Sequence, residues 1–185
     1  MTIYLVHGWR SRGEYMDQLA IGLRARGYAV RVIKYGRTFW RGETEQRSFD
    51  AVVQLVKVAK RGDVVIGHSN GCNIIHDASR VGLKAESCIF LSPALDEDID
   101  SRDYPATFRR IHVWHTKRDW AVWFGRFLPN SDWGQMGRVG YQGNDERFVN
   151  RDWTNTIGGH SEWFDEHLPQ EIDATLKGDG YEKNL

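Results

Sequence analysis

The most constraining feature of this sequence is the segment from Val64 to Asn73. Here a short β-branched run ends in Gly-His-Ser-Asn-Gly, and a helical pattern follows at once. Glycines two residues before and two residues after Ser69 are typical of a strand–turn–helix with a serine on a strained turn. Side chains at Gly67 and Gly71 would clash with such a turn, and glycine tolerates unusual backbone angles. The pattern therefore predicts a sharp turn that exposes the Ser69 hydroxyl at the end of a strand.

Apolar periodicity divides the rest of the chain into alternating strands and helices. We expect strands at 3–6, 28–35, 63–66, 87–91, 109–115 and 147–153, and helices at 14–26, 49–59, 72–82, 120–128, 161–168 and 170–176. Polar loops are expected at 36–44 and 131–144, and Ser161 is the expected N-cap of its helix. This alternation predicts an α/β three-layer sandwich with a mostly parallel sheet. Right-handed crossovers favour six strands in the order 2-1-3-4-5-6.

The length of 185 residues favours one domain, which we expect to span 1–177, with 178–185 as a frayed C-terminal tail. Basic and acidic residues number 25 each, so the chain lacks the basic excess typical of nucleic-acid-binding proteins. We also expect no membrane span and no signal peptide. Cys72 and Cys88 fall in predicted core elements, which indicates buried thiols and favours a cytoplasmic location.

Two further side chains are placed to activate Ser69. A serine hydroxyl is a weak nucleophile at neutral pH and needs a base, usually a histidine that a carboxylate orients. Asp119 follows the fifth predicted strand and His160 follows the sixth, and parallel strands all end on the same edge of a sheet. The sequence therefore predicts a triad of Ser69, Asp119 and His160. Three carboxylates after the fourth strand are alternatives for the acid: Asp96, Asp98 and Asp100.

Taken together, these motifs resemble the α/β-hydrolases over nearly the whole chain. The resemblance lies in an oxyanion loop at His7-Gly8-Trp9, a nucleophile elbow at Gly67-His68-Ser69-Asn70-Gly71, an acid loop at Asp119-Trp120-Ala121-Val122 and a histidine loop at Gly159-His160. It implies Ser69 as the nucleophile, His160 as general base and then acid, and Asp119 as the orienting carboxylate. It also implies an oxyanion hole made by the backbone N–H groups of Asn70 and Trp9, and no cofactor.

The resemblance implies a serine hydrolase that cleaves a carboxylic ester or thioester of a small molecule through an acyl-enzyme. The first predicted strand corresponds to the family's third strand, and the segment after Ser92-Pro93 is too short for a lid domain. We therefore expect a minimal, lidless version of the fold. The alternatives are a non-catalytic small-molecule receptor on the same fold, or an acyltransferase or amidase that uses the same triad.

The remaining histidines are expected to be structural. His7 is expected to shape the oxyanion loop, and His68 to pack beside the nucleophile. His112 and His115 are three residues apart on a predicted strand, so their side chains point to opposite faces of the sheet. That spacing does not suit a shared metal ion, and we predict no metal site.

Several tryptophans fall in or beside the predicted loops at the same edge: Trp9, Trp40, Trp120 and Trp123. They are candidates for an apolar wall that binds an acyl or aromatic group of the substrate. The alternative interpretation is that they fill the end of the core that a lid domain would cover.

Overall fold

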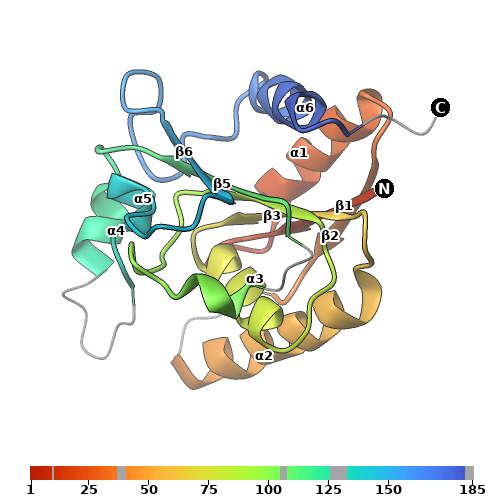
Figure 1. The fold of residues 1–185 in the computed structure, drawn as a ribbon, viewed down its shortest axis with the longest axis horizontal. Helices are drawn as coiled ribbons and strands as arrows, with labels where there is room; N and C mark the ends of the chain where they lie inside the picture. Colours follow the sequence, from red (N-terminus) through yellow and green to blue (C-terminus); the bar gives the residue numbers. More distant parts are fainter. Residues whose placement is uncertain (10, 37–40, 105–107, 126–132, 182–185) are drawn as a thin grey trace.

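A single sheet of six strands forms the centre of the molecule, in a computed structural model that describes residues 1–9, 11–36, 41–104, 108–125 and 133–181. The strands are β1 (Thr2–Val6), β2 (Ala29–Ile33), β3 (Val64–His68), β4 (Ser87–Leu91), β5 (Arg110–His115) and β6 (Phe148–Asp152). Their order is β2-β1-β3-β4-β5-β6, and every neighbouring pair is parallel (Figure 1). The predicted sheet and its strand order are confirmed.

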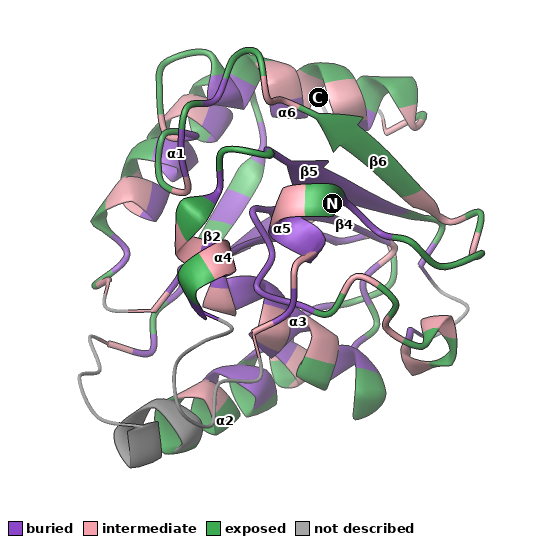
Figure 2. Ribbon diagram, turned by 90° about the vertical axis from the view of Figure 1, so that its left-hand side faces the viewer, coloured by how far each residue is buried: buried purple, intermediate pink, exposed green. Residues whose placement is uncertain are grey.

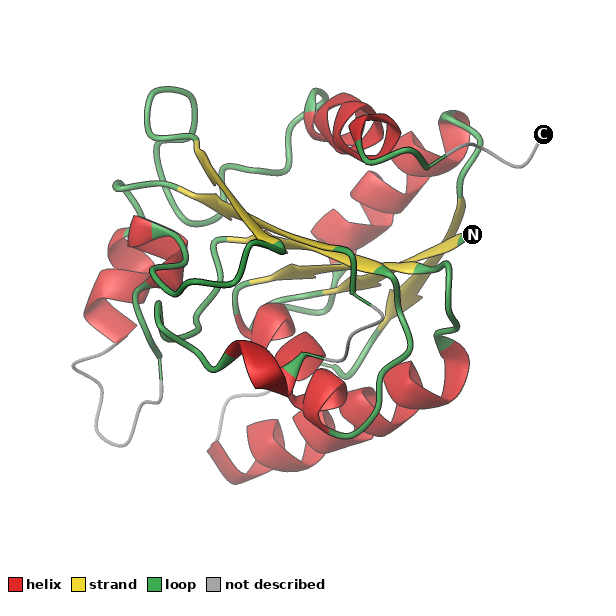
Figure 3. Cartoon of the chain, viewed as in Figure 1, coloured by secondary structure: helices red, strands yellow, loops and turns green. Residues whose placement is uncertain are grey.

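Helices cover both faces of this sheet (Figure 3). One face carries α1 (Glu14–Ala25) and α6 (Leu168–Gly178), and the opposite face carries α2 (Arg41–Val58) and α3 (Asn70–Arg80). The shorter elements are the 3-10 turn η1 (Ser101–Asp103), α4 (Trp120–Gly125) and α5 (Met136–Val139). This is the three-layer arrangement that alternating strands and helices favour.

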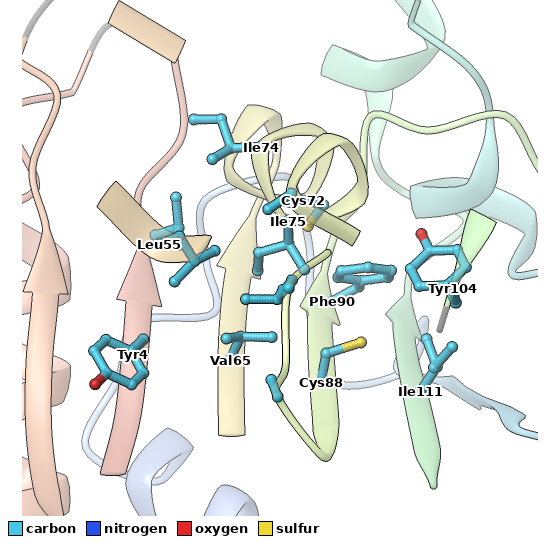
Figure 4. Close-up of a cluster of buried hydrophobic side chains, with 14 of the residues drawn as sticks. Tyr4, Leu55, Val65, Cys72, Ile74, Ile75, Cys88, Phe90, Tyr104 and Ile111 are labelled. Atoms are coloured by element: carbon cyan, nitrogen blue, oxygen red, sulfur yellow. The ribbon is translucent and has the colours of Figure 1, made fainter. Parts of the chain in front are cut away.

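The core consists of two apolar clusters, one on each face of the sheet. Ile3 belongs to the cluster beneath α1 and α6, whereas its neighbour Tyr4 belongs to the cluster beneath α2 and α3, because successive strand side chains point to opposite faces. Figure 4 shows part of the second cluster, with Cys72 of α3 and Cys88 of β4. Both cysteines are buried and neither forms a disulfide.

Burial along the strands explains why the central ones are mostly apolar. Strands β3 and β4 are buried along their whole length, whereas residues 149–152 of β6, at the edge of the sheet, are exposed (Figure 2). A parallel strand that is covered on both faces needs a nearly continuous apolar sequence. The edge strand has only one neighbour and tolerates polar residues.

Two helices occupy segments where loops were expected. α2 begins at Arg41 rather than at 49; residues 41–48 are mostly polar and show no apolar period, but arginine, glutamate and glutamine favour helices. α5 interrupts the expected loop 131–144, where the buried Met136 donates its N–H to the carbonyl of Leu95 at 3.0 Å. α4 ends at Gly125, and the rest of the helix predicted over 120–128 lies outside the described residues.

The helix predicted over 161–168 is wrong, because residues 161–167 form turns and irregular structure, and α6 begins only at Leu168. Their side chains make tertiary contacts instead, and the Trp163 indole N–H donates to Ser92 Oγ at 2.9 Å. Asp165 Oδ1 accepts the N–H groups of His167 and Leu168, each at 3.0 Å. The Asp165 side chain therefore caps the start of α6, whereas Ser161 was expected to cap the helix predicted over 161–168.

The chain after α6 is attached to the sheet as far as it is described. Asp179 Oδ2 lies 2.7 Å from Nε2 of His112 in β5, and Arg109 donates to the main-chain carbonyl of Asp179 at 2.9 Å. Tyr181 is partly buried against the cluster beneath α1 and α6. The predicted boundary at 177 stays a prediction, and residues 182–185 of the expected tail lie outside the described residues.

Candidate active site

Ser69 lies on the turn between β3 and α3, in a backbone conformation that residues with a side chain rarely adopt. Its φ is 54° and its ψ is −123°. A Cβ at Gly67 would lie 2.9 Å from the backbone nitrogen of Cys72, and a Cβ at Gly71 would lie 2.8 Å from the carbonyl oxygen of His7. Both positions therefore need glycine, and the turn has the strained form of a nucleophile elbow.

The loop after β1 packs directly against this elbow. A Cβ at Gly8 would lie 3.1 Å from Cβ of Ser69 and 3.2 Å from Nδ1 of His68, so a larger residue at position 8 would push the loop away. The next residue, Trp9, is partly buried and makes an edge contact with the ring of Trp133 at 5.8 Å. The two segments that are expected to supply oxyanion donors are thus adjacent.

His7 holds this loop from inside the core. Its side chain is fully buried, its Nδ1 donates to the carbonyl of Gly8 at 2.9 Å, and its Nε2 accepts the N–H of Tyr35 at 3.4 Å. The two rings also stack, with centroids 4.0 Å apart. Burial lowers the pKa of His7, which favours the neutral ring that one donor and one acceptor require.

Tyr35 ties the same loop to the elbow. Its hydroxyl donates to the carbonyl of His7 at 2.9 Å and accepts from Nδ2 of Asn70 at 3.3 Å. Burial raises the pKa of Tyr35, so the hydroxyl keeps its proton. The Asn70 side chain is thereby fixed, and its backbone N–H begins α3, where a helix N-terminus favours nearby negative charge.

Asp119 and His160 meet at this edge of the sheet, although they are 41 positions apart in the sequence. Nδ1 of His160 lies 2.9 Å from Oδ1 and 2.8 Å from Oδ2 of Asp119. The carboxylate is fully buried, and its Oδ1 also accepts the N–H of Val122 at 3.0 Å. A histidine whose Nδ1 donates to a carboxylate presents Nε2 for proton transfer.

The three alternative carboxylates follow β4 and are exposed: Asp96, Asp98 and Asp100. Asp100 accepts hydrogen bonds from the backbone N–H and the guanidinium of Arg102 at 2.9 Å, within the turn η1. The contacts of His160 therefore favour Asp119 as the orienting carboxylate.

The loop that carries His160 is fixed on both sides. Before it, the Thr116 hydroxyl donates to the carbonyl of Ile157 at 3.0 Å. After it, the Trp163 indole is bound to Ser92, at the end of β4. Both anchors start from the ends of central strands, so the histidine is held in a defined position relative to the sheet before any substrate binds.

His68, immediately before Ser69, packs against His160, with ring centroids 4.9 Å apart. Its Nε2 lies 2.8 Å from the main-chain carbonyl oxygen of His160, and its Nδ1 lies 3.3 Å from the hydroxyl of Tyr15. Burial, reinforced by the nearby His160, lowers the pKa of His68 to about 3. The sequence predicts packing at this position, and the structure adds hydrogen bonds at both ring nitrogens.

Aromatic side chains lie beside the histidine loop. Trp120 is 63% exposed, and its Nε1 is 4.0 Å from the position that a Cβ of Gly159 would take. Phe124 makes edge contacts with Trp120 and Trp123, at centroid distances of 6.2 and 4.8 Å. Trp40, the fourth candidate for an apolar wall, lies outside the described residues.

Three residues that the sequence analysis does not single out belong to the framework of this site: Tyr15, Tyr35 and Trp163. Each lies within a predicted element, and apolar periodicity alone does not mark it as part of a site. The signal that could have identified them is the polar group on each ring, because a buried tyrosine hydroxyl or tryptophan N–H needs a hydrogen-bond partner. Tyr35 also lies two residues after the end of β2, close to the switch point of the sheet.

Within the described residues, no group of three or more His, Cys, Asp or Glu side chains is arranged to hold a metal ion. Burial raises the pKa of the Cys72 and Cys88 thiols, whereas metal ligands are thiolates. None of the helices, over the same part of the chain, combines the length and the apolar character that crossing a bilayer requires.

Several solved structures share this architecture, and some of them are named as hydrolases. A pyrethroid hydrolase from Sphingobium faniae JZ-2 aligns over 98% of this chain and 99% of its own, with a TM-score of 0.64 and 14% identity. The ydeN gene product from B. subtilis aligns over 97% and 99%, with a TM-score of 0.63 and 16% identity. Alpha/beta hydrolase domain-containing protein 10 from mouse aligns over 96% and 88%, with a TM-score of 0.66 and 13% identity.

No family model and no curated protein matches the sequence. At such low identities the likeness defines the fold, and the chain has the α/β-hydrolase fold. The resemblance read from the sequence motifs is confirmed at that level.

Proposed function

We propose that this protein is a serine hydrolase that cleaves a carboxylic ester or thioester of a small molecule through an acyl-enzyme. The observation that carries the proposal is the buried Asp119 carboxylate, 2.8 Å from Nδ1 of His160, at the edge where Ser69 occupies its strained turn. A buried carboxylate, a histidine and a serine at one sheet edge are the parts that covalent acyl transfer needs.

In the proposed reaction, Ser69 Oγ attacks the substrate carbonyl and its proton passes to Nε2 of His160. Asp119 keeps the ring in the required tautomer and stabilises the imidazolium. The backbone N–H groups of Trp9 and Asn70 donate hydrogen bonds to the developing oxyanion, and one such donor lowers the barrier by about 3–4 kcal/mol. The alcohol or thiol leaves with the proton from His160, and water then releases the acid with His160 as base.

The named neighbours support hydrolysis as the class of reaction. They include a pyrethroid hydrolase, and also an esterase from Pyrococcus furiosus that aligns with a TM-score of 0.61 and 15% identity. The aromatic surface of Trp120, Trp123 and Phe124 beside the His160 loop supports an apolar acyl or aryl group as the part of the substrate bound there. The two reduced, buried cysteines support a cytoplasmic location.

The first prediction tests the nucleophile. A fluorophosphonate probe should modify the wild-type protein once, on the peptide that contains Ser69, as located by mass spectrometry. Ser69→Ala should abolish the adduct, and His160→Ala should slow its formation by at least about 10³-fold, because the hydroxyl loses its base. Ser79→Ala is the matched control, since Ser79 lies in α3 and its hydroxyl donates to the carbonyl of Ile75 at 2.8 Å.

Hydrolysis of p-nitrophenyl butyrate and of a butyryl thioester, measured on the same variants, then separates the leaving groups. An adduct on another serine, or equal labelling of wild type and His160→Ala, would contradict the proposed triad. Folded wild-type protein that forms no adduct and hydrolyses neither compound would overturn the enzyme in favour of a non-catalytic receptor.

A further inference from the structure

A chain of three polar contacts runs from the oxyanion loop to the histidine loop. The N–H of Gly8 donates to the hydroxyl oxygen of Tyr15 at 2.6 Å. That hydroxyl lies 3.3 Å from Nδ1 of His68, and Nε2 of His68 lies 2.8 Å from the carbonyl oxygen of His160. Four separate segments therefore meet through one imidazole: the loop after β1, the start of α1, the end of β3 and the loop after β6.

The chemistry of the two ends assigns every proton in this chain. A main-chain carbonyl can only accept, so Nε2 of His68 carries a hydrogen and donates it to His160. In a neutral ring Nδ1 is then an acceptor, and the Tyr15 hydroxyl donates to it. The Tyr15 oxygen keeps lone pairs that accept the N–H of Gly8. Each group therefore donates to the next, from Gly8 through Tyr15 and His68 to His160.

Burial supports this neutral arrangement. His68 is 3% exposed, and the ring of Phe164 packs against both His68 and Tyr15, with centroids 5.0 and 4.2 Å away. Burial lowers the pKa of His68 to about 3 and raises the pKa of Tyr15. At neutral pH the imidazole therefore carries one proton, and the phenol keeps its own.

We propose that His68 is a positioning residue that fixes the distance between the oxyanion loop and the general base. Through Tyr15 it holds the backbone of Gly8, next to the oxyanion donor expected at Trp9, and through its other nitrogen it holds the backbone of His160. A shift of about 1 Å between groups that must act together can cost about 100-fold in rate. This inference rests on the proposed function.

The test compares two replacements of His68 by the rate of fluorophosphonate labelling and by kcat and KM on p-nitrophenyl butyrate. His68→Phe keeps a ring in the space but loses both hydrogen bonds, and should lower kcat and the labelling rate by about 10- to 100-fold, with KM changed little. His68→Gln can still donate to the carbonyl of His160, and should restore both rates to within about 5-fold of wild type.

Tyr15→Phe tests whether the contacts act as one unit. It should also lower the labelling rate, and the double variant Tyr15→Phe/His68→Phe should lose less than the product of the two single losses, because both changes break the same chain. Phe164→Leu is the control for packing: it should lower the thermal midpoint as His68→Phe does but change the labelling rate by less than about 3-fold. Equal slowing in Phe164→Leu and His68→Phe would overturn the proposal.

A second measurement does not depend on turnover. Two-bond ¹H–¹⁵N spectra of histidine-labelled protein should show His68 as the Nε2–H tautomer between pH 6 and 8, and Tyr15→Phe should shift its Nδ1 resonance. A doubly protonated His68 ring, or His68 as the Nδ1–H tautomer, would overturn the proposed chain of contacts. If wild type and His68→Phe are labelled at Ser69 at the same rate, the positioning role of His68 is overturned and the proposed function stands.

If the wild-type protein is not labelled at all, the proposed function is overturned. The spectra then still test whether His68 forms the proposed contacts.

Discussion

Ser69 and Ser92 are the two residues other than glycine that have positive φ in the described part of the chain, at 54° and 44°. Such conformations cost about 1–3 kcal/mol each and persist where the surroundings enforce them. The N–H of Ser69 donates to the carbonyl of Leu91, and the N–H of Ser92 donates to the carbonyl of Trp114, both at 3.0 Å. Each strained serine is thus held by the neighbouring strand, and both lie at the edge where Asp119 and His160 meet.

A prediction at the scale of one residue concerns the pH dependence of stability. In the unfolded chain His68 titrates near 6.5, whereas burial lowers its folded pKa to about 3. Between these values the unfolded state binds the additional proton, so the free energy of unfolding rises with pH in this range. The group leaves stability unchanged above about pH 6.5 and lowers it as the pH falls towards 3, by up to about 1.4 kcal/mol per pH unit.

Urea unfolding of wild type and His68→Gln between pH 7 and pH 4 measures this contribution. The variant should show a shallower loss of unfolding free energy on acidification, because the glutamine does not titrate. Equal slopes for the two proteins would show that His68 takes up a proton in the folded state.

At the scale of elements, the site depends on how closely α3 approaches β1. The first turn of α3 passes so near the end of β1 that a Cβ at Gly71 would collide with the carbonyl oxygens of Val6 and His7. The helix N-terminus and the oxyanion loop can therefore share one small space. The same contact makes the position of the loop sensitive to the volume of a single residue.

Gly71→Ala should accordingly lower the free energy of unfolding by about 1–3 kcal/mol, because the helix or the strand must move. It should also slow labelling of Ser69, since the moved segments carry the expected oxyanion donors. Gly178→Ala in α6 is the matched control, because its Cβ would meet no atom within 4 Å. That change should leave labelling unaltered and shift stability by less than about 1 kcal/mol. Equal effects of the two substitutions would contradict the argument.

At the scale of the whole molecule, the sheet is closed on one face by the first and last helices together. α1 packs against α6, and a Cβ at Gly22 of α1 would lie 2.5 Å from the ring of Pro169. The residue after α6, Asp179, contacts His112 of β5, and both side chains are about one-tenth exposed. The end of the described chain thus fastens the last layer to the sheet.

Asp179→Ala should lower the free energy of unfolding by about 1–3 kcal/mol, because it leaves a nearly buried imidazole without its partner. Lys177→Ala is the comparison: Lys177 pairs with Asp173 at 2.8 Å across one turn of α6, but its side chain is 57% exposed. Exposed pairs of this spacing contribute about 0.3–0.5 kcal/mol. Thermal or urea unfolding of the two variants should separate them clearly, and similar small effects would mean that Asp179 is not a structural anchor.

Much of this architecture follows from local patterns, because each strand and each helix of an α/β sandwich must bury its own apolar face. The parts that were mispredicted have a different cause. Residues 161–168 have a helical apolar spacing, but Trp163 and Asp165 use their side chains for contacts with Ser92 and with the start of α6. Tyr15 and Tyr35 were missed because their hydroxyls contact residues of other elements and loops, which periodicity does not reveal.

The contact between α1 and α6 also determines when, during synthesis of the chain, the fold can be completed. The ribosome makes Ser69 and its turn early, but the base follows 91 residues later in the numbering, at His160, and the partner of α1 begins only at Leu168. Domains generally fold as units as the chain emerges. A nascent chain that stops before residue 160 lacks both the proposed base for Ser69 and the helix that packs against α1. In this protein, the proposed reactivity therefore arises only when nearly the whole described chain has been made.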